Sequence, residues 1–143
     1  MSLFSAISVG ASGMAAQRQR AELLVENLAN AETTRTPGGG PYRRKDAVFE
    51  STEVSSPFAN VFDTQLRGSG VQVSSIVTDT SDPERRYMPG HPDADADGYV
   101  AFPHISPAED MVDLMGAARG YEANVAAISA VKDMIQKSID LLH

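Results

Sequence analysis

Both ends of the chain repeat apolar residues at alternating spacings of three and four, and a long stretch rich in glycine and proline separates them. This spacing places the repeated residues on one face of a helix. The N-terminal repeat comprises Phe4, Ile7, Ala11, Met14, Arg18, Ala21, Val25 and Leu28, with Arg18 as its polar member. Pro37 and the glycines at 38–40 end any helix that begins there. The pattern therefore predicts a helix within residues 1–31.

The C-terminal segment has a longer repeat and a clearer start. Ser106, Pro107 and Glu109 have the composition of an N-cap, a first-turn proline and a capping-box acid. The repeat that follows comprises Leu114, Ala118, Tyr121, Val125, Ile128, Lys132, Ile135, Ile139 and Leu142. We therefore expect a second long helix within residues 106–143.

The middle of the chain, residues 32–105, is rich in residues that favour turns. Three short stretches within it have the composition of strands, at 71–77, 86–88 and 98–102. The segment 32–66 lacks a clear apolar repeat and is longer than most loops, so we expect an extended arm there.

Together these features predict an α+β fold that is mainly α, organised as an N-terminal helix (1–31), an irregular arm with a small β region (32–105) and a C-terminal helix (106–143). We expect the two helices to pack as an antiparallel coiled coil. Two architectures remain open. The helices belong either to a closed core with a β insertion or to a pair that completes its packing against other subunits.

Charge and cysteine content exclude several classes of function. The net charge of −7 disfavours nucleic-acid binding, which needs a concentrated positive surface. The absence of cysteine excludes disulfides, thiol nucleophiles and cysteine-ligated zinc. No apolar run reaches the roughly 18 residues that a spanning helix requires, and the N-terminal residues lack the basic region of a secretory signal. If the chain leaves the cytoplasm, we expect it to do so without a cleaved signal peptide.

The acidic turn at residues 93–98 resembles the start of a calcium loop, with Asp93, Asp95 and Asp97 followed by Gly98. The twelfth loop position, where such loops carry a bidentate glutamate, is His104. Flanking prolines also exclude a pair of helices around it. We therefore expect no metal site, and favour a docking loop whose charge orients a neighbouring subunit. A calcium-responsive binding module is the alternative.

Known catalytic motifs are absent from the sequence. It has no nucleophile elbow, phosphate loop or dinucleotide fingerprint, and its three histidines have no partner pattern. We expect no enzymatic activity, no cofactor and no small-molecule substrate.

The segment "SGMAAQRQRAELLVENLANAETTRT" resembles the N-terminal signature of bacterial flagellar rod and hook proteins, which here comprises Asn27, Leu28, Ala29, Asn30 and Thr33. The segment "EDMVDLMGAARGYEANVAAISAVKDMIQKSIDLL" is similar to their C-terminal helix, most clearly at Arg119, Tyr121, Glu122, Ala123 and Asn124. The run "MPGHPDADADGYVAFPHISPAEDMVDLM" resembles the proximal rod proteins in particular. The similarity covers roughly residues 1–35 and 85–143.

The resemblance implies a non-enzymatic axial protein that polymerises helically between the membrane ring and the hook. It implies export by the flagellar type III apparatus, a place in the periplasmic rod, and contacts with other copies, other rod proteins including the distal rod, and membrane-ring and export-gate components. The expected subunit interface comprises Phe4, Ile7, Ala11, Met14, Ala21, Val25, Asn27, Leu28, Asn30, Thr33, Leu114, Tyr121, Asn124, Val125, Ile128, Ile135, Ile139 and Leu142. A different axial protein of the same family is a further alternative.

Overall fold

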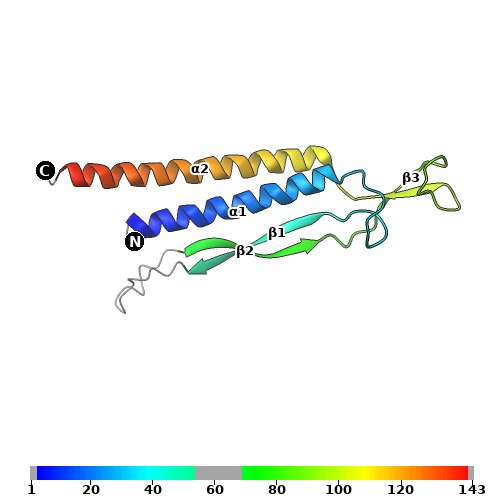
Figure 1. Ribbon diagram of the computed structural model, residues 1–143, viewed down its shortest axis with the longest axis horizontal. Helices are drawn as coiled ribbons and strands as arrows, with labels where there is room; N and C mark the ends of the chain where they lie inside the picture. Colours follow the sequence, from blue (N-terminus) through cyan, green and yellow to red (C-terminus); the bar gives the residue numbers. More distant parts are fainter. Residues whose placement is uncertain (1–2, 54–68, 142–143) are drawn as a thin grey trace.

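The computed structural model describes residues 3–53 and 69–141 (Figure 1). Its elements, in chain order, are α1 (Leu3–Ala29), β1 (Lys45–Glu53), β2 (Ser69–Thr78), β3 (Glu84–Tyr87), β4 (Tyr99–Phe102) and α2 (Pro107–Asp140). The two long helices and the small β region confirm the expected α+β fold that is mainly α.

The elements form three layers with α1 in the middle. On one side α1 packs against α2, which runs antiparallel to it, and on the other side against the hairpin of β1 and β2 (Figure 1). The N-terminus of α1 and the C-terminus of α2 lie at one end of the molecule, and β3 and β4 project beyond the helices at the other end (Figure 1).

Glycines allow the two helices to approach closely. A Cβ atom at Gly10 would lie 2.8 Å from Cγ1 of Ile128, and one at Gly13 would lie 2.8 Å from Oδ1 of Asn124. Gly120 of α2 faces the side chain of Gln17 in the same way. On α1, small residues therefore form this part of the contact, which keeps the two helix backbones close.

The stripe of α1 that faces α2 differs from the predicted one. It follows Gly10, Gly13 and Gln17, one position before the predicted Ala11, Met14 and Arg18. A one-residue shift rotates the contact by about 100° around the helix axis. Because the pattern ranks residues by apolar character, it passes over glycines whose small size decides which faces meet.

This contact leads to a prediction for Gly13→Ala. The added methyl group would overlap the Asn124 carboxamide, which is held in place because its Nδ2 donates to the Gly120 carbonyl at 2.9 Å. Overpacking of this kind costs about 1–3 kcal/mol, which exceeds the gain in helix propensity of up to about 1 kcal/mol. We expect the midpoint of thermal unfolding, followed by circular dichroism, to fall by several degrees.

Gly116→Ala is the matched control. Among the described residues, no atom outside the neighbouring residues and the local backbone of α2 lies within 4 Å of a Cβ placed at Gly116. This variant gains helix propensity without overlap and should melt at or above the wild-type temperature. Equal melting temperatures for the Gly13 and Gly116 variants would contradict the close approach of the helices.

The arm expected over residues 32–66 contains a strand that the apolar pattern does not reveal. Residues 45–53 form β1 and pair antiparallel with β2, from Lys45 opposite Thr78 to Glu53 opposite Ser69. The register shifts between Val48 and Phe49, as in a β-bulge. The sequence therefore predicted the extended arm but not the strand within it. Residues 54–66 of the arm lie outside the described part of the chain.

The start of α2 also differs in detail from the expected capping box. Pro107 occupies the first turn as predicted, but the Ser106 side chain makes no capping hydrogen bond. The Ser106 carbonyl instead accepts the Asp110 amide at 3.0 Å. The rigid φ of proline and this backbone bond set the start of the helix.

Candidate subunit interface

Asn27, at the end of α1, holds β1 against the helix. Its side chain is fully buried. Its Nδ2 donates to the Lys45 carbonyl at 2.9 Å, and its Oδ1 accepts from the Lys45 amide at 2.9 Å and from the Tyr42 hydroxyl at 3.0 Å. Burial, together with the nearby Glu26, raises the pKa of Tyr42 to about 12. The hydroxyl therefore stays protonated and remains a donor at neutral pH.

The other polar residues of the motif also bond within the chain. Asn30 Nδ2 donates to the Glu26 carbonyl at 2.9 Å, and the Thr33 hydroxyl donates to Asn30 Oδ1 at 3.1 Å. The Tyr42 amide donates in turn to the Thr33 carbonyl. In the single chain, Asn27, Asn30 and Thr33 thus end α1 and direct the chain toward β1.

A buried carboxylate joins the start of α2 to the segment before β1. Asp110 is 2% exposed, and its Oδ1 lies 3.0 Å from Nη2 of Arg44. Neither carboxylate oxygen has a hydrogen bond of good geometry within the described residues. Burial raises the pKa of Asp110, while Arg44 opposes that rise. Asp46 and Asp113 also lie within ion-pair distance of Arg44, and Asp113 has a second partner in Arg20 at 3.4 Å.

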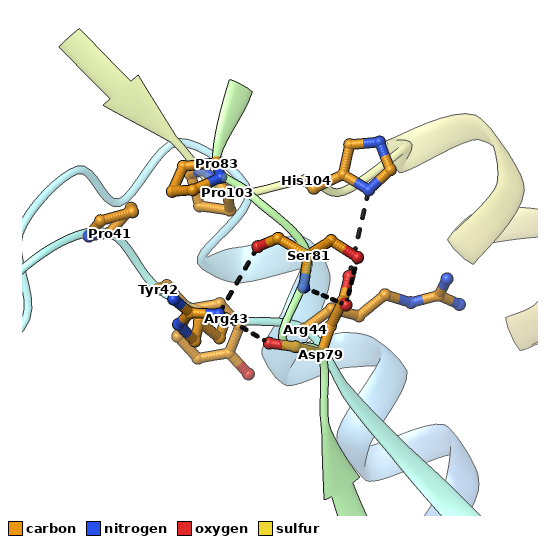
Figure 2. Close-up of a pocket in the computed structure, with 9 residues that line it drawn as sticks. All are labelled: Pro41, Tyr42, Arg43, Arg44, Asp79, Ser81, Pro83, Pro103 and His104. Carbon is orange, nitrogen blue, oxygen red and sulfur yellow. Dashed lines mark hydrogen bonds and ion pairs between the residues drawn. The ribbon is translucent and has the colours of Figure 1, made fainter. Parts of the chain in front are cut away.

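A second junction ties the end of β2 to the loops around it (Figure 2). Arg43 Nη1 donates to the carbonyls of Asp79 and Ser81, at 3.1 and 3.5 Å. Hydrogen bonds from the Ser81 hydroxyl and amide lower the pKa of Asp79, and His104 Nδ1 lies 4.0 Å from the same carboxylate. The cavity among these residues is about 10 Å³, near the minimum for one water molecule. A cavity of this size is too small for a ligand, so these residues connect the segments around the end of β2 and do not form a binding pocket.

The acidic turn is held within the chain by two of its three aspartates. Asp93 Oδ2 accepts the Thr34 hydroxyl at 2.8 Å, and its Oδ1 lies 3.6 Å from Nη1 of Arg35. Asp95 Oδ1 accepts the backbone amides of Asp97 and Tyr99. Across residues 3–53 and 69–141, no three His, Cys, Asp or Glu side chains are grouped as a metal would require. The bonds of Asp93 and Asp95 account for their placement without a ligand.

The residues expected at the subunit interface differ in their exposure. Six are exposed in the single chain: Phe4, Ala11, Val25, Tyr121, Val125 and Ile139. Ten are partly exposed: Ile7, Met14, Ala21, Leu28, Asn30, Thr33, Leu114, Asn124, Ile128 and Ile135. Asn27 is buried, and Leu142 lies outside the described residues. Exposed members occur on both helices, so each helix offers apolar side chains to its surroundings.

The structure also shows exposed apolar residues that sequence reasoning missed. On α2 they are Met111, Val112 and Met115, and on the strands they include Ile76, Val77 and Tyr87. Met111, Met115, Ala118 and Val125 are spaced by four, three and seven residues, which places them along one flank of α2. The predicted repeat that starts at Leu114 includes Ala118 and Val125 of this flank but omits the two methionines.

No helix in the described part of the chain combines the length and the apolar character needed to cross a membrane.

Residues 96–141, which include β4 and all of α2, match the family model for the flagellar basal body rod FlgEFG protein C-terminal region. Similarity to curated proteins extends along the whole chain. The flagellar basal-body rod protein FlgC of Borreliella burgdorferi is 40% identical and aligns with 100% of this chain and 99% of its own length. The FlgC proteins of Bacillus subtilis and Salmonella typhimurium are 41% and 36% identical, with 99% of this chain aligned in each case and 99% and 98% of their own lengths. With relatives of this identity over its whole length, the chain belongs to the FlgC family of flagellar basal-body rod proteins.

Proposed function

We propose that the chain is a structural subunit of the proximal rod and polymerises through its terminal helices into the axial driveshaft that transmits torque to the hook and filament. The observation that carries this proposal is the exposed apolar flank of α2, formed by Met111, Met115, Ala118 and Val125. A row of exposed apolar side chains on one helix marks a surface for another protein. A helical polymer covers such a flank in every copy.

We further propose that α1 and α2 form an antiparallel coiled coil in the assembled rod. The residues of α1 that face α2 include Gly10, Gly13 and Gln17, whose spacing of three and four is that of a heptad seam. The remaining apolar positions of the predicted interface flank this seam. Neighbouring subunits would cover them, with Asn27, Asn30 and Thr33 supporting the interface by fixing the end of α1.

The family suggests the partners and the location of such a subunit. We propose that it contacts other copies and other rod proteins, including the distal rod, and meets membrane-ring and export-gate components at the rod base. The rod lies in the periplasm, and the chain reaches it through the flagellar type III apparatus without a cleaved signal peptide. The proposal requires no cofactor, catalytic activity, small-molecule substrate or nucleic acid. The hydrogen bonds of Asp93 and Asp95 lend no support to a calcium-responsive module.

The proposal can be tested by Val125→Asp in a motile bacterium that depends on this chain. Val125 is 42% exposed, and charged substitutions at exposed sites usually change the free energy of unfolding by no more than about 0.5 kcal/mol. The purified variant should therefore melt like the wild type. In the rod the aspartate would be buried without a partner in each subunit, at a cost of several kcal/mol per copy. We expect cells without complete rods, which do not swim.

Val125→Ile is the matched control, because it keeps an apolar side chain at the same position and should preserve swimming. Normal swimming of the Val125→Asp strain would contradict the proposed interface. A fall of many degrees in the melting temperature of the purified aspartate variant would instead show that Val125 packs within its own chain.

A further inference from the structure

Residues 84–102, which we call the finger, comprise β3, β4 and the turn between them. The finger extends from the end of the molecule opposite the N-terminus of α1 and the C-terminus of α2 (Figure 1). Its inner side is anchored by Val100 and Phe102, which are buried. All four residues of β3 are exposed. The finger is therefore a projection with one anchored side and one free side.

The direction of the finger is fixed by contacts at its turn and at its base. Thr34, in the loop after α1, donates a hydrogen bond to Asp93 in the turn. At the base, Arg43 donates to the carbonyls of Asp79 and Ser81, just before β3. These bonds connect the projection to the body of the fold at two separated points, so its free side is presented in a defined orientation.

The free side carries two ordered aromatic side chains, Tyr87 and Tyr99, which we call the platform. The two tyrosine rings lie edge to face with centroids 5.4 Å apart. Tyr87 also rests on Gly98, where a Cβ atom would lie 2.9 Å from its Cε2 and where φ is +81°. Tyr87 is nevertheless 65% exposed. Exposed aromatic side chains that are already ordered lose little conformational entropy on binding, and tyrosine is enriched where binding energy concentrates.

The opposite end of the molecule also exposes large apolar side chains. Phe4 of α1 is 76% exposed and Leu141 at the end of α2 is 88% exposed, with Leu3 and Ile139 nearby in sequence and also exposed. The two ends differ in structure and point in opposite directions (Figure 1). A two-fold contact between platforms would leave the helix ends uncovered, whereas a head-to-tail contact covers both ends in a continuing stack.

We propose that the platform docks on the exposed apolar end of the terminal helix pair of the next rod subunit along the axis. The partner is a rod protein whose paired helices end, as in this chain, in exposed aliphatic and aromatic side chains. Tyr87 inserts its ring edge among those side chains, and Tyr99 supports it from behind. This inference rests on the proposed rod function and adds an axial contact to the lateral contacts of α2.

The contact can be mapped by placing benzoylphenylalanine, a photoreactive aromatic residue, at position 87 of the full chain in living cells. Basal bodies are then isolated and irradiated, and the cross-linked peptides are identified by mass spectrometry. The expected cross-links join position 87 to the first turns of the N-terminal helix or the last turns of the C-terminal helix of another rod subunit. Cross-links to a surrounding ring protein, or to the flank of a helix pair, would overturn the proposal.

The same photoreactive residue at position 125 separates this inference from the proposed function. Cross-links between position 125 and neighbouring rod subunits, combined with the wrong partner at position 87, would reject the axial contact alone. If the unaltered protein and both photoreactive variants are all absent from basal bodies, the rod function itself is rejected.

A pair of substitutions decides the question if the photoreactive variant does not assemble. Tyr87→Ser removes the ring from an exposed site, so the melting temperature of the purified chain should stay close to that of the wild type. The number of complete rods per cell should fall about tenfold or more, as for loss of a residue that dominates an interface. Tyr87→Phe keeps the ring and should retain rod assembly. Normal rod numbers with Tyr87→Ser would refute the proposed docking.

Discussion

Replacing Arg44 with glutamine is expected to lower the free energy of unfolding by about 3–5 kcal/mol at neutral pH, the range for a buried charge that loses its partner. The Asp110 carboxylate is almost completely buried, and Arg44 is its ion-pair partner at 3.0 Å. Glutamine is neutral and shorter, so it leaves the carboxylate without compensation beside Asp46 and Asp113. Urea unfolding at constant temperature measures the loss.

The penalty should depend on pH in a defined direction. Burial raises the folded-state pKa of Asp110 above its unfolded value, and Arg44 acts against that rise. A carboxyl group with a raised folded pKa destabilises the fold when ionised, so stability falls as pH increases from the unfolded pKa through the folded one. Without Arg44 the folded pKa should rise further. The difference between wild type and Arg44→Gln should therefore be largest at neutral pH and shrink as the pH approaches about 4.

Asp110→Asn is the matched control for this pair. It removes the buried charge, and Arg44 keeps Asp46 at 3.4 Å and Asp113 at 3.8 Å as partners. We expect this variant to be tolerated, and the double variant Arg44→Gln/Asp110→Asn to recover most of the stability lost with Arg44→Gln alone. A loss that is independent of pH and unrelieved in the double variant would mean that Arg44 acts through packing alone.

Asn27→Ala is expected to lower the free energy of unfolding by more than about 3 kcal/mol, because each buried polar group left without a partner costs about 1–3 kcal/mol. The substitution removes three hydrogen bonds and leaves the Lys45 amide, the Lys45 carbonyl and the Tyr42 hydroxyl to find new partners. For a domain of this size the melting temperature should fall by at least about 6 °C. Differential scanning calorimetry of the purified chain measures both quantities.

Asn30→Ala provides the comparison, since Asn30 belongs to the same motif but is partly exposed. Its bonds to Glu26 and Thr33 lie where water can replace them, so we expect a loss of about 1 kcal/mol. Equal losses for the Asn27 and Asn30 variants would contradict the central role of the buried amide. Both effects appear in the isolated chain, which distinguishes them from the assembly defect expected for Val125→Asp.

The two helices could be predicted because their apolar residues recur with the helical period over many turns. The same pattern misplaced the stripe of α1 that faces α2. Periodicity reports which residues avoid water, but it does not distinguish burial within the chain from burial against a neighbour. Phe4 and Val25 remain exposed, while Gly10 and Gly13 make the contact because small residues let two helix backbones approach.

The strand β1 was not predicted because its sequence lacks the alternation of apolar and polar residues that is typical of a strand. Ala47, Val48 and Phe49 are adjacent in sequence rather than alternating, and acidic residues flank them. Pairing with β2, across a segment outside the described residues, determines their conformation, and strand formation depends on such context more than helix formation does.

Long-range polar contacts were equally hidden from sequence reasoning. The motif around Asn27 was recognisable by resemblance, but its partner Lys45 lies 18 residues away and Thr34 lies 59 residues from Asp93. Neither pair has a spacing that a helix or a strand would impose. Their identification requires coordinates, and they show that Asp93 and Asp95 of the acidic turn bond within the chain.

The middle position of α1 has a consequence for how the sequence can vary among related chains. Only a minority of the residues of α1 are exposed, whereas most of those of α2 are, because α1 is covered on two sides and α2 on one. Substitutions in α1 must satisfy two sets of neighbours within the same chain. Over much of its surface, α2 has no neighbours among the described residues of the chain. Substitutions there are restrained only by the other proteins that the helix contacts. Divergence in α1 should therefore follow changes in the hairpin and in α2, and divergence along the outer side of α2 should follow changes in other proteins.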